Sequence, residues 1–495
     1  MSLINVTNLT FAYDGSYDNI FENVSFQIDT DWKLGFTGRN GRGKTTFLNL
    51  LLGKYEYSGS ISSKVPFEYF PYEVKNKKNN TIDVIEEIFP NYVLWEVMRE
   101  LSLLEVDDDV LYRAFDTLSN GEQTKVMLAT LFLKENSFLL IDEPTNHLDI
   151  NARMVVSDYL RTKHGFILVS HDRAFLDNCI DHILSINKTN IEIQKGDFSS
   201  WWENKEMQDN YERSENDKLK KDIKRLSEAA KRTSEWSNKA EAKKIGFDPT
   251  QTEKNIGRRP YQGAKAKKMM SRSKSIKERQ QSAIEGKSKL LKNIENSEKL
   301  KISQLKFHTD RLLELENVSI FYGDKTACDN VTFTIEQGDR ISLMGKNGSG
   351  KSSIIKLICG EQINYTGTMR KSNQLRISYV SQNTTHLCGN LSNYAVANEI
   401  DESLFKAILR KLDFSRVQFE KDISDFSGGQ KKKVLIAKSL CDKAHLHIWD
   451  EPLNFIDVIS RMQIEELLLE HQPTILFVEH DIEFCNNIAT KIVQL

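Results

Sequence analysis

Short apolar runs recur along the chain, and each ends in glycine or in charged residues. The runs KLGFTG at 33–38 and RISLMG at 340–345 read as strands, and stretches with apolar residues at helical spacing follow them, FLNLLL at 47–52 and IIKLIC at 354–359. Four further runs, at 138–141, 166–169, 446–449 and 475–478, read as strands that end in acidic or histidine residues. This order of strand, loop and helix predicts the α/β class, with chemistry at the carboxyl ends of the strands.

The chain contains an internal repeat. GRNGRGKTT at 38–46 returns as GKNGSGKSS at 345–353, and Lys44 and Lys351 are 307 positions apart. Other pairs keep this offset within two residues, namely Tyr13 and Tyr322, Ser119 and Ser427, Glu143 and Glu451, and His171 and His480. Residues from about 200 to 310 match neither copy. We therefore predict three parts: a first nucleotide-binding domain at 1–202, a linker at 203–308 and a second nucleotide-binding domain at 309–495.

Both copies carry the phosphate-binding pattern G-x-x-x-x-G-K-[ST] between a strand and a helix. Backbone N–H groups of such a loop converge on phosphates, Lys44 or Lys351 reaches the terminal phosphates, and Thr45 or Ser352 ligates Mg²⁺. One such loop could be a chance turn, but two in a matched repeat argue strongly against that. The loop residues expected to bind ATP are Gly38, Arg39, Asn40, Gly41, Arg42, Gly43, Lys44, Thr45 and Thr46, and Gly345, Lys346, Asn347, Gly348, Ser349, Gly350, Lys351, Ser352 and Ser353.

Paired carboxylates end one strand of each copy. We expect Asp142 and Asp450 to hold Mg²⁺, and Glu143 and Glu451 to polarise the attacking water. Isolated pairs of this kind are more often solvated carboxylates, and a lone histidine is more often structural. The place of these residues in the repeated series favours catalysis, and it extends this role to His171 and His480, which lie 28 and 29 residues after the glutamates.

LSNGEQ at 118–123 and FSGGQK at 426–431 resemble the signature sequence of the ABC superfamily. The resemblance implies that two domains face head to tail, so that each ATP lies between the phosphate loop of one domain and the signature of the other. It implies that Tyr13 and Tyr322 stack on adenine, that Asp149 and Asp457 belong to the D-loops, and that Gln382 contacts Mg²⁺. The signature residues implied at the nucleotide are Ser119, Asn120, Gly121 and Glu122, and Ser427, Gly428, Gly429 and Gln430.

The two copies depart from this pattern in different ways. In the first copy, Tyr72 takes the place of Gln382, and Asn120 takes the place of Gly428. The second copy has DEPLNFID where the first has DEPTNHLD. In a head-to-tail arrangement each site contains one departure, so we expect the two sites to hydrolyse ATP at different rates.

The segment between the copies is strongly basic. From Lys218 to Lys292 it has 23 basic and 8 acidic residues, although the whole chain has a net charge of −2. It lacks Pro and Gly from about Asn204 to Ile245, and a second helical stretch begins near Ala264. We predict two antiparallel helices of about 40 residues, each about 60 Å long, with a tip at about 245–263.

A solvated coiled-coil spacer is the alternative for this segment, but such a spacer normally balances its charges. A net charge of +15 predicts contact with nucleic-acid phosphates instead. The residues expected to contact nucleic acid are Lys243, Lys244, Phe247, Lys254, Arg258 and Arg259. Phe247 either stacks on a base or pins the tip to its own helices, and Tyr261 fits the pinning role better.

Two cassettes joined by a basic hairpin, with no apolar run of the roughly 18 to 20 residues that cross a bilayer, resemble the ABC-F ATPases. The motifs that carry the resemblance are WKLGFTGRNGRGKTT, LIDEPTNHLD, HGFILVSHDRAF, AKKMMSRSK and, for the Lsa and Vga type of resistance protein, IWDEPLNFID. The resemblance implies a cytoplasmic monomer that binds the 70S ribosome at its exit site, beside 23S rRNA and P-site tRNA. There the linker tip would dislodge lincosamides, streptogramins A and pleuromutilins, with no part for membrane or DNA.

Three other functions stay open on the sequence. A housekeeping ABC-F translation factor would share every motif, although the short stretch between Tyr72 and Phe115 leaves little room for an additional arm. The ATPase pair of a membrane transporter has no evident need for a basic hairpin. A DNA-repair ATPase is the weakest of the three. Six scattered cysteines and the absence of a signal sequence fit a reduced cytosol.

Overall fold

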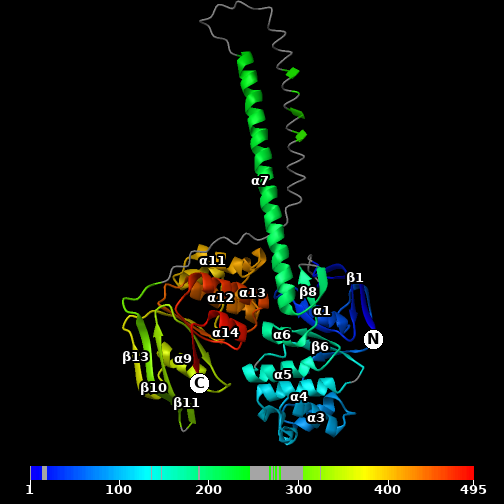
Figure 1. The fold of residues 1–495 in the computed structure, drawn as a ribbon, viewed down its shortest axis with the longest axis vertical. Helices are drawn as coiled ribbons and strands as arrows, with labels where there is room; N and C mark the ends of the chain where they lie inside the picture. Colours follow the sequence, from blue (N-terminus) through cyan, green and yellow to red (C-terminus); the bar gives the residue numbers. More distant parts are fainter. Residues whose placement is uncertain are drawn as a thin grey trace, which may run out of the picture. The chain divides into compact units, whose positions relative to one another are not determined.

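The structure, a computed structural model, describes residues 2–13, 19–134, 136–146, 148–187, 190–245, 305–323 and 325–495, with a few short helical pieces between 267 and 279. The chain forms two compact units, one with residues 1–201 and 299–495 and the other with residues 202–298. Both halves of the repeat belong to the first unit (Figure 1).

The first repeat is built on a six-stranded sheet with the order β5-β6-β7-β3-β8-β9. All neighbours are parallel except β8 and β9. The apolar runs form its centre because every residue from Phe138 to Ile141 is buried, as expected for a strand that is covered on both faces. The strands are β3 (Lys33–Thr37), β5 (Phe67–Phe70), β6 (Phe138–Asp142), β7 (Phe166–Val169), β8 (His182–Asn187) and β9 (Asn190–Lys195).

A second, antiparallel sheet packs on the first through one helix. It has the order β2-β1-β4 and consists of β1 (Leu3–Phe11), β2 (Phe21–Asp29) and β4 (Ser58–Ser62). The Phe47 ring of helix α1 (Lys44–Leu51) lies between the sheets, with its centroid 6.0 Å from that of Phe21 and 5.5 Å from that of Phe36. This packing fixes the start of α1, where the phosphate loop ends.

Helices and short 3-10 turns complete the first repeat. Those between β5 and β6 are α2 (Thr81–Ile88), α3 (Leu94–Leu103), η1 (Asp108–Tyr112), η2 (Phe115–Thr117) and α4 (Asn120–Phe132). Those after β6 are α5 (Ile150–Arg161) and α6 (Arg173–Cys179).

The second repeat has the same strand order, except that its main sheet has five described strands and no counterpart of β9. Its main sheet has the order β14-β15-β16-β12-β17, and its antiparallel sheet has the order β11-β10-β13. The strands are β10 (Arg311–Tyr322), β11 (Lys325–Glu336), β12 (Arg340–Met344), β13 (Asn364–Lys371), β14 (Ile377–Val380), β15 (Leu446–Asp450), β16 (Ile475–Val478) and β17 (Lys491–Gln494). The predicted α/β class with a duplicated domain is confirmed.

The helices of the second repeat also match those of the first. They are α9 (Lys351–Cys359), α10 (Leu391–Ala397), α11 (Glu402–Lys411), α12 (Gly428–Cys441), α13 (Val458–His471) and α14 (Ile482–Ile488), with η4 (Arg416–Glu420) and η5 (Ile423–Asp425) between α11 and α12.

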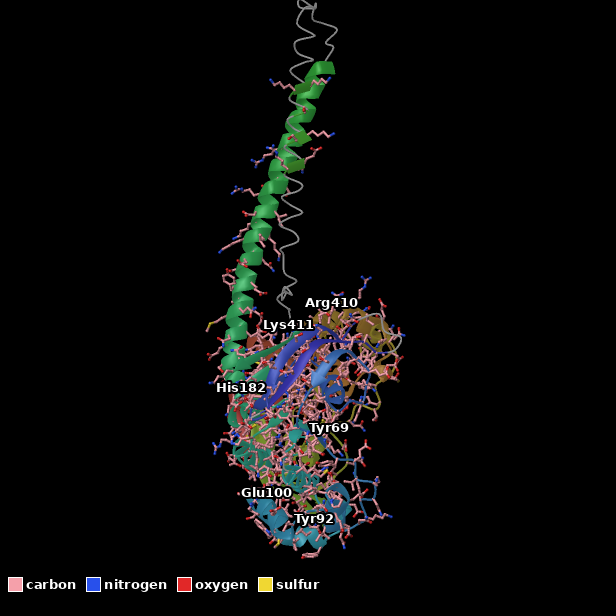
Figure 2. All side chains as sticks on the ribbon, turned by 90° about the vertical axis from the view of Figure 1, so that its right-hand side faces the viewer. Tyr69, Tyr92, Glu100, His182, Arg410 and Lys411 are labelled. Carbon is pink, nitrogen blue, oxygen red and sulfur yellow. The ribbon has the colours of Figure 1, made fainter. Side chains whose placement is uncertain are left out.

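Helix α7 (Phe198–Ile245) runs without a break for 48 residues, which is roughly 72 Å at 1.5 Å per residue. It begins about six residues before the predicted start near Asn204, directly after Gly196, and the Asp197 carboxylate caps it by accepting from the Ser200 N–H at 2.9 Å. The side chains drawn on its described part project outward (Figure 2). The predicted tip and almost all of the second helix lie outside the described residues.

Candidate functional site

The two phosphate loops have the same backbone and depend on glycine at the same point. Gly43 and Gly350 cap α1 and α9 in the left-handed conformation, with φ of 94° and 88°. A Cβ at Gly43 would lie 2.5 Å from Ile20 Cγ2, and one at Gly350 would lie 2.7 Å from the Ala327 carbonyl oxygen. Both the φ angle and the lack of space therefore require glycine.

The loop lysines lie under their own loops. Lys44 Nζ donates to the Gly38 carbonyl at 2.6 Å, and Lys351 Nζ donates to the Gly345 carbonyl at 2.7 Å. Burial lowers the pKa of both ammonium groups, and nearby carboxylates oppose that shift. Each loop thus places a buried cation where strand and helix meet, which suits phosphate binding.

A hydroxyl and a carboxylate meet at the carboxyl end of one strand in each repeat. Thr45 Oγ1 donates to Asp142 Oδ2 at 3.3 Å, and Ser352 Oγ donates to Asp450 Oδ1 at 3.5 Å. These oxygens are the hard donors that Mg²⁺ prefers. Burial raises the pKa of both aspartates. A bound cation would offset the cost of burying their negative charge.

The next residue of each strand end, a glutamate, lies beside the predicted histidine. Glu143 Oε1 is 3.1 Å from His171 Nε2, and Glu451 Oε1 is 3.7 Å from His480 Nε2. Both glutamates have positive φ, 51° and 47°, which turns their side chains away from the strand direction. The structure therefore brings together each predicted Asp, Glu and His.

The two glutamates differ in what surrounds them. Burial, with repulsion from Asp142, raises the pKa of Glu143 to about 8. Burial also favours the neutral form of Glu451, but the nearby His480 and the hydrogen bonds from Gln382 and Asn454 outweigh it and lower the pKa to about 2. The amides of Gln382 and Asn454 donate to Glu451 Oε2 at 2.8 Å and 2.6 Å. The sequence did not single out Asn454.

Tyr72 stands where the first repeat would have the glutamine. It follows β5 by two residues, as Gln382 follows β14. Its ring contacts Lys134, whose Nζ lies 5.0 Å from the ring centroid. A different tyrosine that the sequence analysis missed, Tyr69, reaches the site and donates its hydroxyl to Asp142 Oδ2 at 3.0 Å. The sequence signal that could have identified Tyr69 was the alternation of side-chain direction along β5.

The signature segments form helix N-termini. Ser119 caps α4 by accepting from the Glu122 N–H at 3.2 Å, and Ser427 caps α12 by accepting from the Gln430 N–H at 3.4 Å. Free N–H groups at such ends favour anions. A Cβ at Gly428 would meet the Phe455 ring only at 3.7 Å, so a side chain such as that of Asn120 fits at this position.

The first phosphate loop lies against the second repeat. Asn40 Nδ2 donates to the Phe455 carbonyl at 2.7 Å, and a Cβ at Gly429 would lie 3.0 Å from the same Asn40 nitrogen. Phe455 has a φ of 64°, which directs its carbonyl to this contact. One composite site thus joins the loop of the first repeat to the signature of the second.

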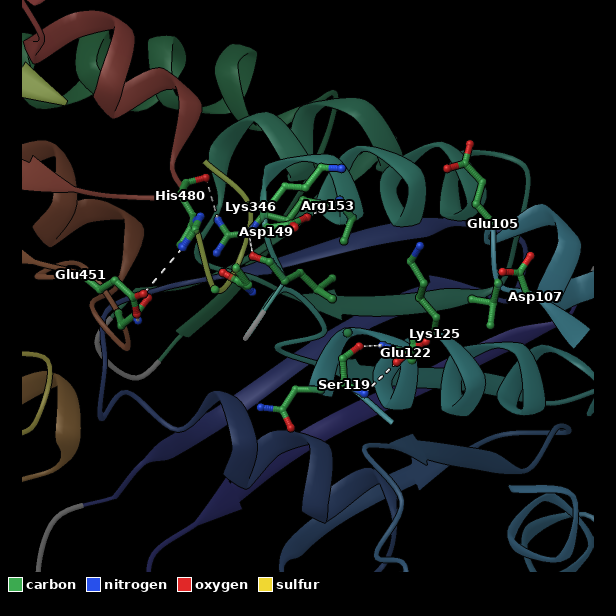
Figure 3. A pocket seen from close by; sticks show the side chains of 18 of the residues that line it. Glu105, Asp107, Ser119, Glu122, Lys125, Asp149, Arg153, Lys346, Glu451 and His480 are labelled. Atoms are coloured by element: carbon green, nitrogen blue, oxygen red, sulfur yellow. Dashed lines mark hydrogen bonds and ion pairs between the residues drawn. The ribbon is translucent and has the colours of Figure 1, made fainter. Parts of the chain in front are cut away.

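The reciprocal site is a cavity of about 670 Å³ (Figure 3). One wall comes from the first repeat, with Ser119, Asn120, Gly121, Glu122 and Asp149. The other comes from the second repeat, with Lys346, Asn347, Gly348, Gln382, Glu451 and His480. The loops and signatures therefore meet head to tail, as the ABC resemblance implies.

The remaining predicted residues lie outside the contacts described above. Tyr13 and Tyr322 are exposed at 43% and 50%, as a stacking platform requires, and the Tyr13 hydroxyl lies 2.7 Å from Thr46 Oγ1. Lys243 and Lys244 lie in the last turn of α7, but their side chains are outside the described part, as are Phe247, Lys254, Arg258, Arg259 and Tyr261.

Known proteins match both repeats. The family model described as ABC transporter matches residues 21–146 and 328–454. Ribosome protection protein VmlR of Bacillus subtilis (strain 168) is 28% identical over 489 residues, which cover 97% of this chain and 84% of VmlR. ATP-binding protein Uup of Buchnera aphidicola subsp. Schizaphis graminum is 27% identical, over 99% of this chain and 80% of its own.

Solved structures share the fold. The archaeal ribosome recycling factor aABCE1, solved in complex with the ribosomal stalk protein aP1, superposes with a TM-score of 0.62 at 18% identity, over 98% of this chain and 87% of its own. None of the helices in the described ranges is long and apolar enough to span a bilayer. The family match covers both phosphate loops and both Asp-Glu pairs, so the chain belongs to the ABC family and is an ATPase with two ATP-binding domains.

Proposed function

We propose that this ATPase is an ABC-F protein that binds the ribosome and protects it from antibiotics. The observation that carries the proposal is α7, a long helix inserted between two ATP-binding domains. An ATPase that only hydrolyses ATP has no need of such an element. A ribosome-binding protein can use it to reach RNA.

The charge along α7 is segregated. Residues 198–217 include six acidic and two basic side chains, whereas residues 218–245 include ten basic and four acidic ones. The basic part extends for about 42 Å at the helical rise per residue. Clustered Lys and Arg residues on a helix bind phosphates with an affinity that falls steeply with salt.

The relatives support the proposed ribosome-protection function. VmlR is called a ribosome protection protein, and its similarity extends over almost the whole of this chain. We propose the drug classes that the sequence resemblance implies, namely lincosamides, streptogramins A and pleuromutilins. A housekeeping translation factor is the second candidate, because Uup and the probable ATP-binding protein YheS match at nearly the same identity.

The composite sites suggest how ATP would control binding. Each nucleotide would touch a phosphate loop of one repeat and a signature of the other, so ATP would stabilise the closed pair of domains. Mg²⁺ held by Thr45 and Asp142, or by Ser352, Asp450 and Gln382, would neutralise phosphate charge. Glu143 and Glu451 would orient water, and hydrolysis would end the closed, ribosome-bound state. We assign adenine stacking to Tyr13 and Tyr322.

Co-sedimentation with 70S ribosomes tests the proposal. A Glu143→Gln, Glu451→Gln variant should pellet with ribosomes in ATP but not without it, and less at 300 mM than at about 100 mM salt. Adding Lys220→Glu and Lys221→Glu should weaken binding further. Lys77→Glu with Lys78→Glu, which makes the same charge change on an exposed loop of the first repeat, should not. Binding that is independent of ATP would overturn the proposal.

Drug susceptibility separates protection from housekeeping. Cells that express the wild-type chain should tolerate the three drug classes better than cells with a chain deleted for residues 246–262. Equal tolerance with both chains, alongside ATP-dependent ribosome binding, would favour the housekeeping factor. The deleted chain must retain its ATPase activity for this comparison.

A further inference from the structure

An ion pair ties the first phosphate loop to the helical part of the second repeat. Arg39 Nη1 lies 2.7 Å from Asp413 Oδ1, and Arg42 Nη2 lies 3.8 Å from Asp413 Oδ2. The side chains of Arg39 and Asp413 are 22% and 18% exposed, so solvent screens the contact only in part. Asp413 is not one of the phosphate-loop, signature, Asp-Glu or His residues of the ATP sites.

Asp413 occupies a defined position at the end of α11. It has a φ of 68°, its N–H donates to the Arg410 carbonyl at 3.0 Å, and the Phe414 N–H donates to the Leu409 carbonyl at 2.9 Å. This left-handed position after a helix usually holds glycine or asparagine. A carboxylate with this backbone suggests that the charge itself is used.

Glu105 holds the equivalent position in the first repeat. It follows α3 with a φ of 54°, its N–H donates to the Ser102 carbonyl at 3.1 Å, and the Val106 N–H donates to the Leu101 carbonyl at 3.0 Å. The backbone pattern matches that of Asp413 bond for bond. Both repeats therefore present a carboxylate from the same point.

Arg39, the cation of this ion pair, also has an equivalent in the second repeat. Lys346 follows the first glycine of the second phosphate loop, as Arg39 follows that of the first. Glu105 of the first repeat and Lys346 of the second both line the 670 Å³ cavity (Figure 3). Within the described ranges, no ion pair joins Glu105 to Lys346, whereas the matching pair at the first site is formed.

A second pair of contacts differs between the sites in the same sense. Lys433 Nζ donates to Asp457 Oδ2 at 3.0 Å beside the first site. The equivalent residues, Lys125 and Asp149, both line the cavity and form no ion pair with each other in the part of the chain that the structure describes. Lys433 and Asp457 both belong to the second repeat, and Lys125 and Asp149 both belong to the first, so this difference lies within each repeat beside its site.

We propose that Glu105 and Lys346 form an ion pair when the second ATP site closes, as Asp413 and Arg39 do at the first site, and that each pair helps to hold its site closed. Glu105 and Asp413 are then positioning residues for ATP turnover. The first pair is the stronger one, because Arg39 offers a planar fork of donors and Arg42 adds a second cation. The Lys346 ammonium is a single, more strongly hydrated charge.

Charge exchange in the full-length chain tests this pairing. Glu105→Lys should raise the KM for MgATP on the order of fivefold, because repulsion replaces attraction across the closing site. Lys346→Glu should raise it at least as much. The double variant should return to within about twofold of wild type, since the pair is restored in reverse. Asp108→Lys, the same charge change at an exposed residue outside the cavity, is the matched control.

The first pair provides a parallel test. Asp413→Lys should raise the KM, and Arg39→Asp should partly rescue Asp413→Lys. Thermal unfolding of every variant shows whether the fold is kept. If Glu105→Lys fails to fold, Glu105→Gln replaces it. A KM for Glu105→Lys equal to that for Asp108→Lys would overturn the proposal, as would a double variant no better than its worse single parent.

Discussion

The Tyr69 hydroxyl donates to Asp142 Oδ2 at 3.0 Å, which gives the first of the two proposed Mg²⁺ ligands, Asp142 and Asp450, a tyrosine partner. Tyr379 lies at the equivalent register of β14, opposite Ile448 as Tyr69 is opposite Leu140. No hydrogen bond joins Tyr379 to Asp450 in the part of the chain that is described. Burial and the nearby carboxylate raise the pKa of Tyr69, so its hydroxyl stays a donor at neutral pH.

Tyr69→Phe should raise the Mg²⁺ concentration that gives half-maximal ATPase activity by about tenfold at the first site, because partners of a metal ligand orient it. The measurement is a Mg²⁺ titration in a Glu451→Gln background, where the first site carries the turnover. Tyr379→Phe is the matched control and should leave the titration unchanged. An unchanged titration in Tyr69→Phe would show that Asp142 needs no such orientation.

The two sites should turn over at different rates. Each Glu→Gln change removes the proposed general base of its own site, an effect of about 10² to 10⁴. The remaining site then has Glu451 held by Gln382 and Asn454, or Glu143, to which no side-chain amide donates within the described part of the chain. Single-turnover rates of Glu143→Gln and Glu451→Gln variants should therefore differ. Equal rates would mean that the amides do not affect the chemistry.

Sequence patterns predicted the strands and helices that depend mainly on residues near them in the sequence. The strands before each phosphate loop and each Asp-Glu pair were found because short apolar runs are buried on both faces. The start of α7 was placed about six residues too late, because Gly196 and the cap at Asp197 mark it rather than the composition near Asn204. The Asn40 to Phe455 contact joins positions 415 residues apart, and only the packing of the repeats creates it.

Glu100 should contribute to the stability of the first repeat. Its side chain is 2% exposed and accepts from the Tyr159 hydroxyl at 2.6 Å and from Lys163 Nζ at 2.5 Å. Burial favours the neutral carboxyl, but the bonds from Lys163 and Tyr159 outweigh it and lower the pKa. Glu100→Gln should therefore reduce the free energy of unfolding by about 1–3 kcal/mol at pH 7.

The pH dependence of that loss follows from the lowered pKa of Glu100. The carboxylate stabilises the folded state above its unfolded pKa of 4.5, and this contribution disappears as pH falls through the lower folded pKa. The difference between wild type and Glu100→Gln in denaturant unfolding should thus be full at pH 7 and shrink below pH 4.5. Glu86→Gln, at an exposed position of α2, should change little at either pH. A loss that does not vary with pH would point to packing instead.

Arg173 joins the two repeats on one side only. Its guanidinium lies 2.7 Å from Glu465 on α13 and 3.1 Å from Glu483 on α14, and its side chain is 7% exposed. The second repeat has Ile482 at the equivalent position, so no reciprocal pair is possible there. The contact therefore joins the first repeat to two helices of the second.

Arg173→Met should cost about 3–5 kcal/mol in the stability of the joined repeats, because it leaves Glu465 buried without its cation. Denaturant unfolding should then change from one transition to two, as each repeat unfolds separately. Arg161→Met, at an exposed arginine of α5, should shift stability by less than about 0.5 kcal/mol. Glu465→Gln combined with Arg173→Met should cost less than the two single changes together, since the second change removes the stranded charge. Strict additivity would show that the ion pair does not couple the repeats.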